Sequence, residues 1–216
     1  MQIKNTYLLA YNVTLLCGWL TYLHVFVFQI ITTRSIEITF RSCSTLLQVV
    51  QYVPVVEVLH AVLKIINAPF ATTVIQIFSR VLVVAVLSAF SHSALSVGYV
   101  MISVAWSLAE IVRYLYYVVN VVDKNKMWYW LVWCRYSLFI VLYPIGVVGE
   151  LITLWQSMEE LKKVNVVKGI TLSDCVKVVI VGYVPGLLML YLHLLKQRRK
   201  VMGKVRDKKK EWFIYI

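Results

Sequence analysis

The sequence predicts an all-α fold: a polytopic membrane bundle of six transmembrane helices with both termini in the cytosol. Of the 216 residues, 61% are hydrophobic and only 15% are charged. A soluble domain carries about 25% charged residues, most of them on its water-facing surface. The alternation of apolar and polar residues that is typical of an outer-membrane barrel does not occur in this sequence. The composition therefore argues against a soluble enzyme, a disordered protein and a secreted disulfide scaffold.

Six stretches are long and apolar enough to cross the hydrocarbon, which takes about 20 residues at about 1.5 Å each. They are approximately residues 8–31, 44–66, 70–90, 95–122, 128–155 and 175–195. The second stretch is the weakest, because five polar residues or prolines interrupt it: Gln48, Gln51, Pro54, Glu57 and His60. If this segment lay on the membrane surface instead, the chain would have five spans.

Local features define the limits of several stretches. The first is too long for the apolar region of a signal peptide and is not followed by a small-residue cleavage site, so we expect it to be retained. Pro144 interrupts the fifth and predicts a kink or local unwinding, because proline removes a backbone donor. The sixth ends at a run of basic residues that begins with Lys196.

The distribution of basic residues supports an even number of spans. With six spans, 13 of the 22 lysines and arginines lie on one side, five on the other, and four within or at the ends of spans. The 13 are Lys4, Lys64, Lys124, Lys126 and nine residues between Lys196 and Lys210. Because an excess of basic residues marks the cytosolic side, both termini are expected there.

We predict one membrane domain, residues 1–195, followed by a basic cytosolic tail, residues 196–216. The net charge of +12 mainly reflects this topology. The tail fits a topology signal better than a site for anionic lipid headgroups, which is the alternative. Nucleic acid is not expected as a partner, because no nucleic-acid-reading module accompanies the positive charge.

The cysteines show no pattern that is typical of a disulfide, metal or redox site. Cys17, Cys43, Cys134 and Cys175 occur singly, and we interpret them as buried thiols that pack as small hydrophobes. A tyrosine-phosphatase loop needs an arginine six residues after its nucleophilic cysteine, and none of the four has one. Phosphatase chemistry is therefore excluded, and no metal site is predicted.

Six ionisable side chains fall within the predicted spans, where a charge costs about 3 kcal/mol or more. They are Glu57, Arg80, Glu110, Arg113, Arg135 and Glu150. Three acids and three bases balance in sign, which favours an internally paired cluster inside the bundle. Two alternatives stay open: purely structural ion bridges between helices, and proton-coupled transport, although six spans without a detectable repeat are a poor basis for transport.

The fifth stretch combines a phenol and a carboxyl. Tyr136, Tyr143 and Glu150 are spaced by seven residues, so their side chains lie on one helix face. Gly146 and Gly149 leave space beside that face for a ligand or for close approach of another helix. Tyr143 and Glu150 therefore form a candidate acid/base pair. On spacing alone, aromatic packing around a structural acid explains the same pattern.

Two of these segments carry long motifs of a known family. Residues 135–150, RYSLFIVLYPIGVVGE, resemble the R-Y-x-L-F-x-x-L-Y-P-x-G-x-x-x-E signature of the very-long-chain (3R)-3-hydroxyacyl-CoA dehydratases, also called the protein-tyrosine-phosphatase-like A family. Residues 106–117, WSLAEIVRYLYY, are similar to that family's W-S-x-x-E-I-[VI]-R-Y-x-[YF]-Y block. Shorter matches occur at residues 11–19, 76–80 and 183–186, so the similarity extends from about Tyr7 to Met202.

The resemblance implies a six-span enzyme of the endoplasmic reticulum that performs the third step of fatty-acid elongation. Such an enzyme is a hydro-lyase that removes water from (3R)-3-hydroxyacyl-CoA to give trans-2-enoyl-CoA. The family's catalytic tyrosine and glutamate fall on Tyr143 and Glu150. Its supporting positions fall on Arg80, Glu110, Arg113, Arg135 and Gly146. The chain ends without a dilysine retrieval signal, so this location is implied by the resemblance alone.

Elimination of water needs a base for the proton on C2 and an acid for the hydroxyl on C3. We expect Tyr143 to act on C2 and Glu150 on the hydroxyl, with the reverse order open. Because a phenol is a weak base, Tyr143 would need a nearby cation such as Arg135 or Arg113. No cofactor is expected, since the substrate itself carries coenzyme A.

The expected partners are a long-chain 3-hydroxyacyl-CoA substrate, the lipid bilayer and other elongation enzymes, the elongase and the reductases. The acyl chain should lie within the bundle, with the CoA phosphates at the cytosolic mouth. The alternative function is that of a catalytically silent relative that scaffolds the elongation enzymes. An intact Tyr143 and Glu150 pair argues against that alternative.

Overall fold

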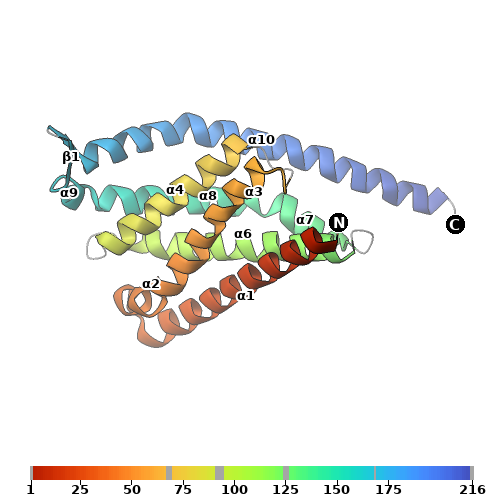
Figure 1. The fold of residues 1–216 in the computed structure, drawn as a ribbon, viewed down its shortest axis with the longest axis horizontal. Coiled ribbons are helices and arrows are strands. Elements are labelled where there is room, and N and C mark those ends of the chain that lie inside the picture. Colours follow the sequence, from red (N-terminus) through yellow and green to blue (C-terminus); the bar gives the residue numbers. More distant parts are fainter. Residues whose placement is uncertain (1, 67–69, 91–94, 124–126, 168, 215–216) are drawn as a thin grey trace.

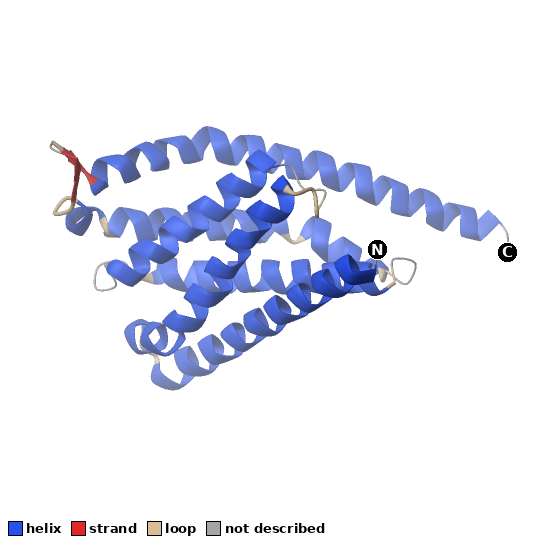
Figure 2. Ribbon diagram, in the orientation of Figure 1, coloured by secondary structure: helices blue, strands red, loops and turns tan. Residues whose placement is uncertain are grey.

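The computed structural model describes residues 2–66, 70–90, 95–123, 127–167 and 169–214 (Figure 1). Almost all of them are helical, and a short antiparallel hairpin is the exception (Figure 2). In chain order the elements are α1 Gln2–Thr33, α2 Ile36–Tyr52, η1 Val53–Val55, α3 Val56–Val62, α4 Phe70–Ala89, α6 Val97–Val122, α7 Tyr129–Ser137, α8 Phe139–Gln156, α9 Met158–Leu161, β1 Asn165–Val167, β2 Ile170–Thr171 and α10 Leu172–Ile214. The predicted all-α class is confirmed.

Five helical segments of the described chain are long and apolar enough to cross a membrane, which indicates a multi-pass membrane protein. They are Ile3–Thr33, Ile36–Val62, Val97–Val122, Tyr129–Gln156 and Leu172–Gly203. The second of these includes most of the weakest predicted stretch, residues 44–66, and ends at Val62. The predicted span at residues 70–90 corresponds to α4, whose segment Thr73–Ala89 is a shorter apolar helix. Five spans are therefore supported, and the sixth stays a prediction.

Successive long helices run in alternating directions (Figure 1). The N-terminus and the C-terminal ends of α6 and α10 lie toward one end of the bundle, at the right in Figure 1. The turn between α1 and α2 and the β hairpin lie at the other end. Lys4 is consequently at the first end, whereas Arg34 and Lys162 are at the second. This separation matches the grouping of basic residues on which the predicted topology depends.

The turn between α1 and α2 is specified by two neighbouring residues. Arg34 adopts a left-handed conformation with φ 51°, which reverses the chain after α1. Ser35 then serves as the N-cap of α2, where its side chain accepts a hydrogen bond from the backbone N–H of Ile38. The two helices consequently pack side by side, and buried aromatic rings from both, including Trp19, Tyr22 and Phe40, belong to the hydrophobic core.

The fifth predicted span is interrupted, but not at its proline. Helix α7 ends at Ser137 and α8 begins at Phe139, with Leu138 between them. Pro144 lies six residues later, inside α8. The irregularity therefore precedes the proline that was expected to cause it, and α8 continues as a helix through Pro144.

The last helix, α10, is continuous from Leu172 to Ile214 and contains Pro185. The predicted tail therefore continues the last membrane helix without a break. Arg198 of this continuation donates a hydrogen bond from Nε to Ser137 Oγ at 3.0 Å, so α10 is joined to the end of α7. Many large apolar side chains of α10, such as Val178 and Met189, are exposed on the bundle surface, as expected for a helix that faces lipid.

The cysteine interpretation is partly wrong. All four thiols are free, and only Cys43 is buried. Cys17 and Cys175 are exposed on the surface of the bundle. A thiol is apolar enough to face lipid there. Within the described ranges, no group of three or more His, Cys, Asp or Glu side chains could hold a metal ion.

Helix α6 packs tightly against α8 through two glycines. A Cβ atom added to Gly149 would lie 2.9 Å from the carbonyl oxygen of Gly98 and 2.8 Å from Ile102 Cγ2. A Cβ atom added to Gly146 would lie 3.7 Å from the nearest atoms, those of Ala105 and Trp106, which is an ordinary contact. Of the two uses proposed for these glycines, close helix approach is therefore the one that the structure supports at Gly149.

We expect Gly149→Ala to lower the apparent melting temperature of the detergent-solubilised protein, because the backbones of α6 and α8 must move apart. Overpacking of this kind costs about 1–3 kcal/mol. Gly146→Ala is the matched control, since its new methyl group meets atoms only at van der Waals distance. Equal melting temperatures for the two variants would contradict the close approach at Gly149.

Candidate active site

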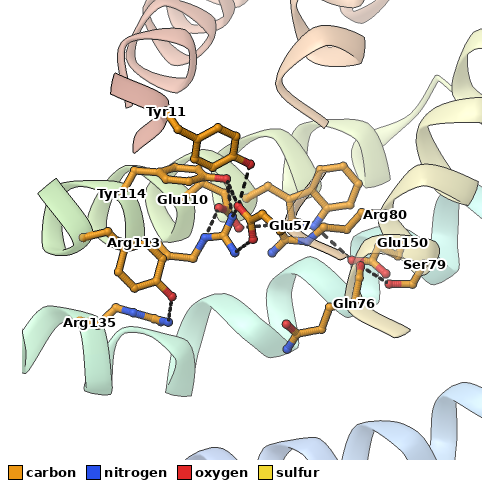
Figure 3. Close-up of polar contacts among 12 residues, drawn as sticks. Tyr11, Glu57, Gln76, Ser79, Arg80, Glu110, Arg113, Tyr114, Arg135 and Glu150 are labelled. Atoms are coloured by element: carbon orange, nitrogen blue, oxygen red, sulfur yellow. Dashed lines mark hydrogen bonds and ion pairs between the residues drawn. The ribbon is translucent and has the colours of Figure 1, made fainter. Parts of the chain in front are cut away.

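Four of the six predicted intramembrane charges form one buried network (Figure 3). Glu110 on α6 pairs through Oε1 with Arg80 on α4 and through Oε2 with Arg113 Nε, which is 2.6 Å away. The guanidinium of Arg113 also donates two hydrogen bonds of 3.1 Å to Glu57 on α3. Two acids and two bases thus alternate along the chain of contacts.

Two phenols complete the surroundings of the Glu57 carboxylate. Tyr114 on α6 donates to Oε1 at 2.8 Å, and Tyr11 on α1 donates to the same oxygen at 3.2 Å. Arg113 in addition lies 4.5 Å from the centre of the Tyr114 ring, a cation–π contact. The network, which we call the ion-pair network, therefore joins α1, α3, α4 and α6. The predicted internal pairing is confirmed for Glu57, Arg80, Glu110 and Arg113.

Arg135 does not join the ion-pair network through a direct contact in the part of the chain that the structure describes. It lies on α7, where its guanidinium is 3.5 Å from Tyr117 Oη and 5.8 Å from the ring centres of both Tyr117 and Tyr136. It also lines a small cavity of about 40 Å³ between α6 and the junction of α7 with α8, together with Leu138 and Leu142. The cavity is far too small for an acyl chain.

Glu150 is also separate from the ion-pair network, and its direct partners are uncharged. Its side chain is buried on α8. Trp106 on α6 donates from Nε1 to Glu150 Oε1 at 3.1 Å, and Tyr183 on α10 donates from its hydroxyl to Oε2 at 2.7 Å. Each carboxyl oxygen therefore accepts one hydrogen bond from a neighbouring helix. Among the acids of the bundle interior, Glu150 is the one without an arginine at ion-pair distance in the described structure.

Tyr143, like Glu150, contacts helix α10. Its ring is half-buried and stacks on the ring of Tyr191 on α10, with 6.0 Å between the ring centres. Positions 143 and 150 of α8 thus lie opposite positions 191 and 183 of α10, which is the register of two antiparallel helices. The structure places both candidate catalytic side chains along the boundary between α8 and α10, as their spacing of seven residues predicts.

Tyr136, the third residue of the seven-residue series, points elsewhere. Its ring packs edge-on against Tyr116 of α6, with 6.0 Å between ring centres. Leu138, the single residue between α7 and α8, lies between Tyr136 and Tyr143 and keeps helical backbone angles, φ −61° and ψ −26°. The sequence pattern was therefore right for two of the three side chains.

The expected help from Arg113 to Tyr143 does not match the contacts observed. All three guanidinium nitrogens of Arg113 contact Glu57, Glu110 or Tyr114. The observed contacts of Arg113 therefore belong to the ion-pair network, and the helper role of Arg135 stays a prediction.

Sequence reasoning missed three side chains around the pair. Trp106 begins the motif in residues 106–117 and Tyr183 begins the match at residues 183–186, so both were visible but had no assigned role. Tyr191 lies outside the quoted motifs, and nothing in the sequence singles it out. Each of the three contacts its partner across helices, and such a contact leaves no local spacing in the sequence.

Comparisons with known proteins agree with the motifs. Residues 51–204 match the profile described as protein tyrosine phosphatase-like protein, PTPLA. A very-long-chain (3R)-3-hydroxyacyl-CoA dehydratase of Caenorhabditis elegans is 34% identical over 95% of this chain and 98% of its own length. Human very-long-chain (3R)-3-hydroxyacyl-CoA dehydratase 2 is 29% identical over 96% of this chain and 85% of its own. A probable dehydratase of the same name from Schizosaccharomyces pombe is 31% identical over 92% and 94%. No solved structure matches the chain significantly. The chain belongs to the protein tyrosine phosphatase-like PTPLA family.

Proposed function

We propose that the protein is a very-long-chain (3R)-3-hydroxyacyl-CoA dehydratase, a hydro-lyase that forms trans-2-enoyl-CoA in the third step of fatty-acid elongation. The observation that carries the proposal is the placement of Tyr143 and Glu150 on α8, opposite α10, with Glu150 outside the ion-pair network. The names of the relatives, which are similar over almost the whole chain, support the same reaction.

The two side chains supply the proton transfers that the elimination requires. One group removes a proton from C2, the C2–C3 double bond forms, and the C3–O bond breaks as the other group protonates the departing hydroxyl. Water leaves, and a proton then passes from the first group back to the second. The reaction consumes and releases no net proton, so a phenol and a carboxyl are sufficient.

The contacts support an assignment in which Glu150 acts as the base and Tyr143 acts as the acid. Both oxygens of Glu150 accept hydrogen bonds, which fits an ionised carboxylate. The reverse order, expected from the sequence, needs a cation beside Tyr143. Arg113 contacts carboxylates instead, and the guanidinium of Arg135 lies against Tyr117 and Tyr136. Tyr143 is then a neutral phenol, which can donate its proton to the hydroxyl on C3.

The reaction takes place within a membrane domain formed by residues 1–195, in a topology of six spans with both termini in the cytosol. The acyl chain lies among the apolar helices, and the phosphates of CoA stay at the cytosolic end, where the basic residues gather. The endoplasmic reticulum membrane, with the elongase and reductases as neighbours, is the location that fits this step. Because the substrate carries CoA, no further cofactor is assigned.

The experiment that tests the function is an assay of the purified protein in detergent with a long-chain (3R)-3-hydroxyacyl-CoA. We expect time-dependent formation of the trans-2-enoyl product, measured by mass spectrometry, and no product from the (3S) isomer. A folded, monodisperse protein that forms no enoyl-CoA from either isomer would contradict the proposal and favour the scaffold alternative.

A further inference from the structure

The Glu150 carboxyl group is held between two side chains that belong to different helices. Trp106 on α6 donates to Oε1, and Tyr183 on α10 donates to Oε2. We propose that Trp106 and Tyr183 are positioning residues that fix the Glu150 carboxylate for proton transfer. This inference depends on the proposed dehydratase function and assigns roles to two residues outside the set predicted from the sequence.

A carboxylate on a flexible side chain needs such restraint. The Glu150 side chain has three rotatable bonds, and the backbone of α8 restricts only the first of them. Two donors on separate oxygens define both the position and the plane of the carboxylate. Precise orientation of a catalytic group has a large effect on rate, because a misplacement of about 1 Å can cost about 100-fold.

Trp106 is itself held rigidly. It is 3% exposed, and the guanidinium of Arg80 lies 5.5 Å from the centre of its ring. A Cβ atom at Gly146 would lie 3.7 Å from Trp106 Nε1. The indole therefore packs close to the α8 backbone at this glycine. Arg80 and Gly146, both predicted as supporting positions, thus contact the residue that donates to Glu150. Their support acts through Trp106.

Tyr183 holds the opposite side of the carboxylate from a different helix. The hydroxyl of Tyr183 therefore connects α10 with α8 at the level of Glu150. Removing this hydroxyl alone would release Oε2 and leave the ring packing unchanged.

The test uses Tyr183→Phe and Trp106→Phe, each of which removes one donor and keeps a ring. We expect kcat for dehydration to fall about 10- to 100-fold in each, the size of effect typical of a hydrogen bond to a charged group. KM for the acyl-CoA should stay within about twofold, because the lost contact is made to Glu150 and not to substrate.

The chain offers matched controls. Trp19 is as buried as Trp106, but its Nε1 has no hydrogen-bond partner in the described structure. Trp19→Phe thus removes the same atoms without removing a donor to Glu150, and it should keep kcat near the wild-type value. Tyr52 is exposed on α2, and Tyr52→Phe is the corresponding control for the loss of a phenol hydroxyl. Wild-type kcat in Tyr183→Phe and Trp106→Phe would overturn the proposal.

A double-variant cycle separates positioning from a general structural effect. Glu150→Asp shortens the side chain by one methylene, so its carboxylate cannot reach both donors. If Tyr183 acts through Glu150, Tyr183→Phe should lower kcat far less when combined with Glu150→Asp than it does in the wild type. Full additivity of the two changes would overturn the proposal. If Trp106→Phe fails to fold, the Tyr183→Phe cycle alone decides. An inactive wild-type enzyme would contradict the dehydratase function itself, which is a separate result.

Discussion

Tyr143→Phe and Glu150→Gln should each lower the rate of dehydration by at least about 100-fold, the lower limit typical of general acid or base catalysis. Phe keeps the ring that stacks on Tyr191 and removes only the hydroxyl that would donate the proton. Gln keeps the shape of Glu150, but its amide cannot accept the proton that leaves C2. Enoyl-CoA formation from a long-chain 3-hydroxyacyl-CoA, followed with purified variants, measures both effects.

Tyr136→Phe is the control for Tyr143→Phe. Tyr136 precedes Tyr143 by seven residues, yet its ring contacts Tyr116 of α6 and not α10. Loss of its hydroxyl should leave dehydration near the wild-type rate. All variants should elute from size exclusion as the wild type does. Wild-type turnover by Tyr143→Phe or by Glu150→Gln would remove the acid/base pair from the mechanism.

Much of the fold could be predicted because a bilayer imposes a simple length and hydropathy requirement on each span. That requirement placed the stretch at residues 44–66 in the membrane despite its polar residues, and the structure explains why Glu57 and His60 are tolerated. Glu57 is fully paired, and His60 bonds through Nε2 to Tyr7 Oη at 2.7 Å. The break at Leu138 could not be predicted, because no proline or glycine marks it.

The candidate pair could be predicted because both members lie on one helix, where spacing determines the shared face. Their partners could not, since Trp106 and Tyr183 reach Glu150 from α6 and α10. The distribution of charges was predicted only in outline. A balance of three acids and three bases is consistent with many pairings, and the sequence does not state that Arg113 would pair with Glu57 rather than assist Tyr143.

Breaking the ion-pair network should have the largest effect on stability. Arg113→Gln leaves Glu57 and Glu110 buried without the cation between them, while Arg80 still contacts Glu110. Removal of one partner from a buried ion pair costs about 3–5 kcal/mol, since the remaining charge stays desolvated. We expect a marked fall in the apparent melting temperature in detergent, with loss of folded protein at the temperature where the wild type is stable.

Removing the Glu57 charge, which Arg113→Gln leaves buried and unpaired, should restore part of the lost stability. In the double variant Glu57→Gln, Arg113→Gln, no acid stays unpaired at position 57, and Tyr11 and Tyr114 can still donate to the amide oxygen. The double variant should therefore be more stable than Arg113→Gln alone. Arg41→Gln is the control, because the Arg41 pair with Glu37 is exposed and screened by water, so its loss should leave the melting temperature unchanged. A double variant that is less stable than the single one would mean that Glu57 contributes through its hydrogen bonds to α1 and α6 rather than through its charge.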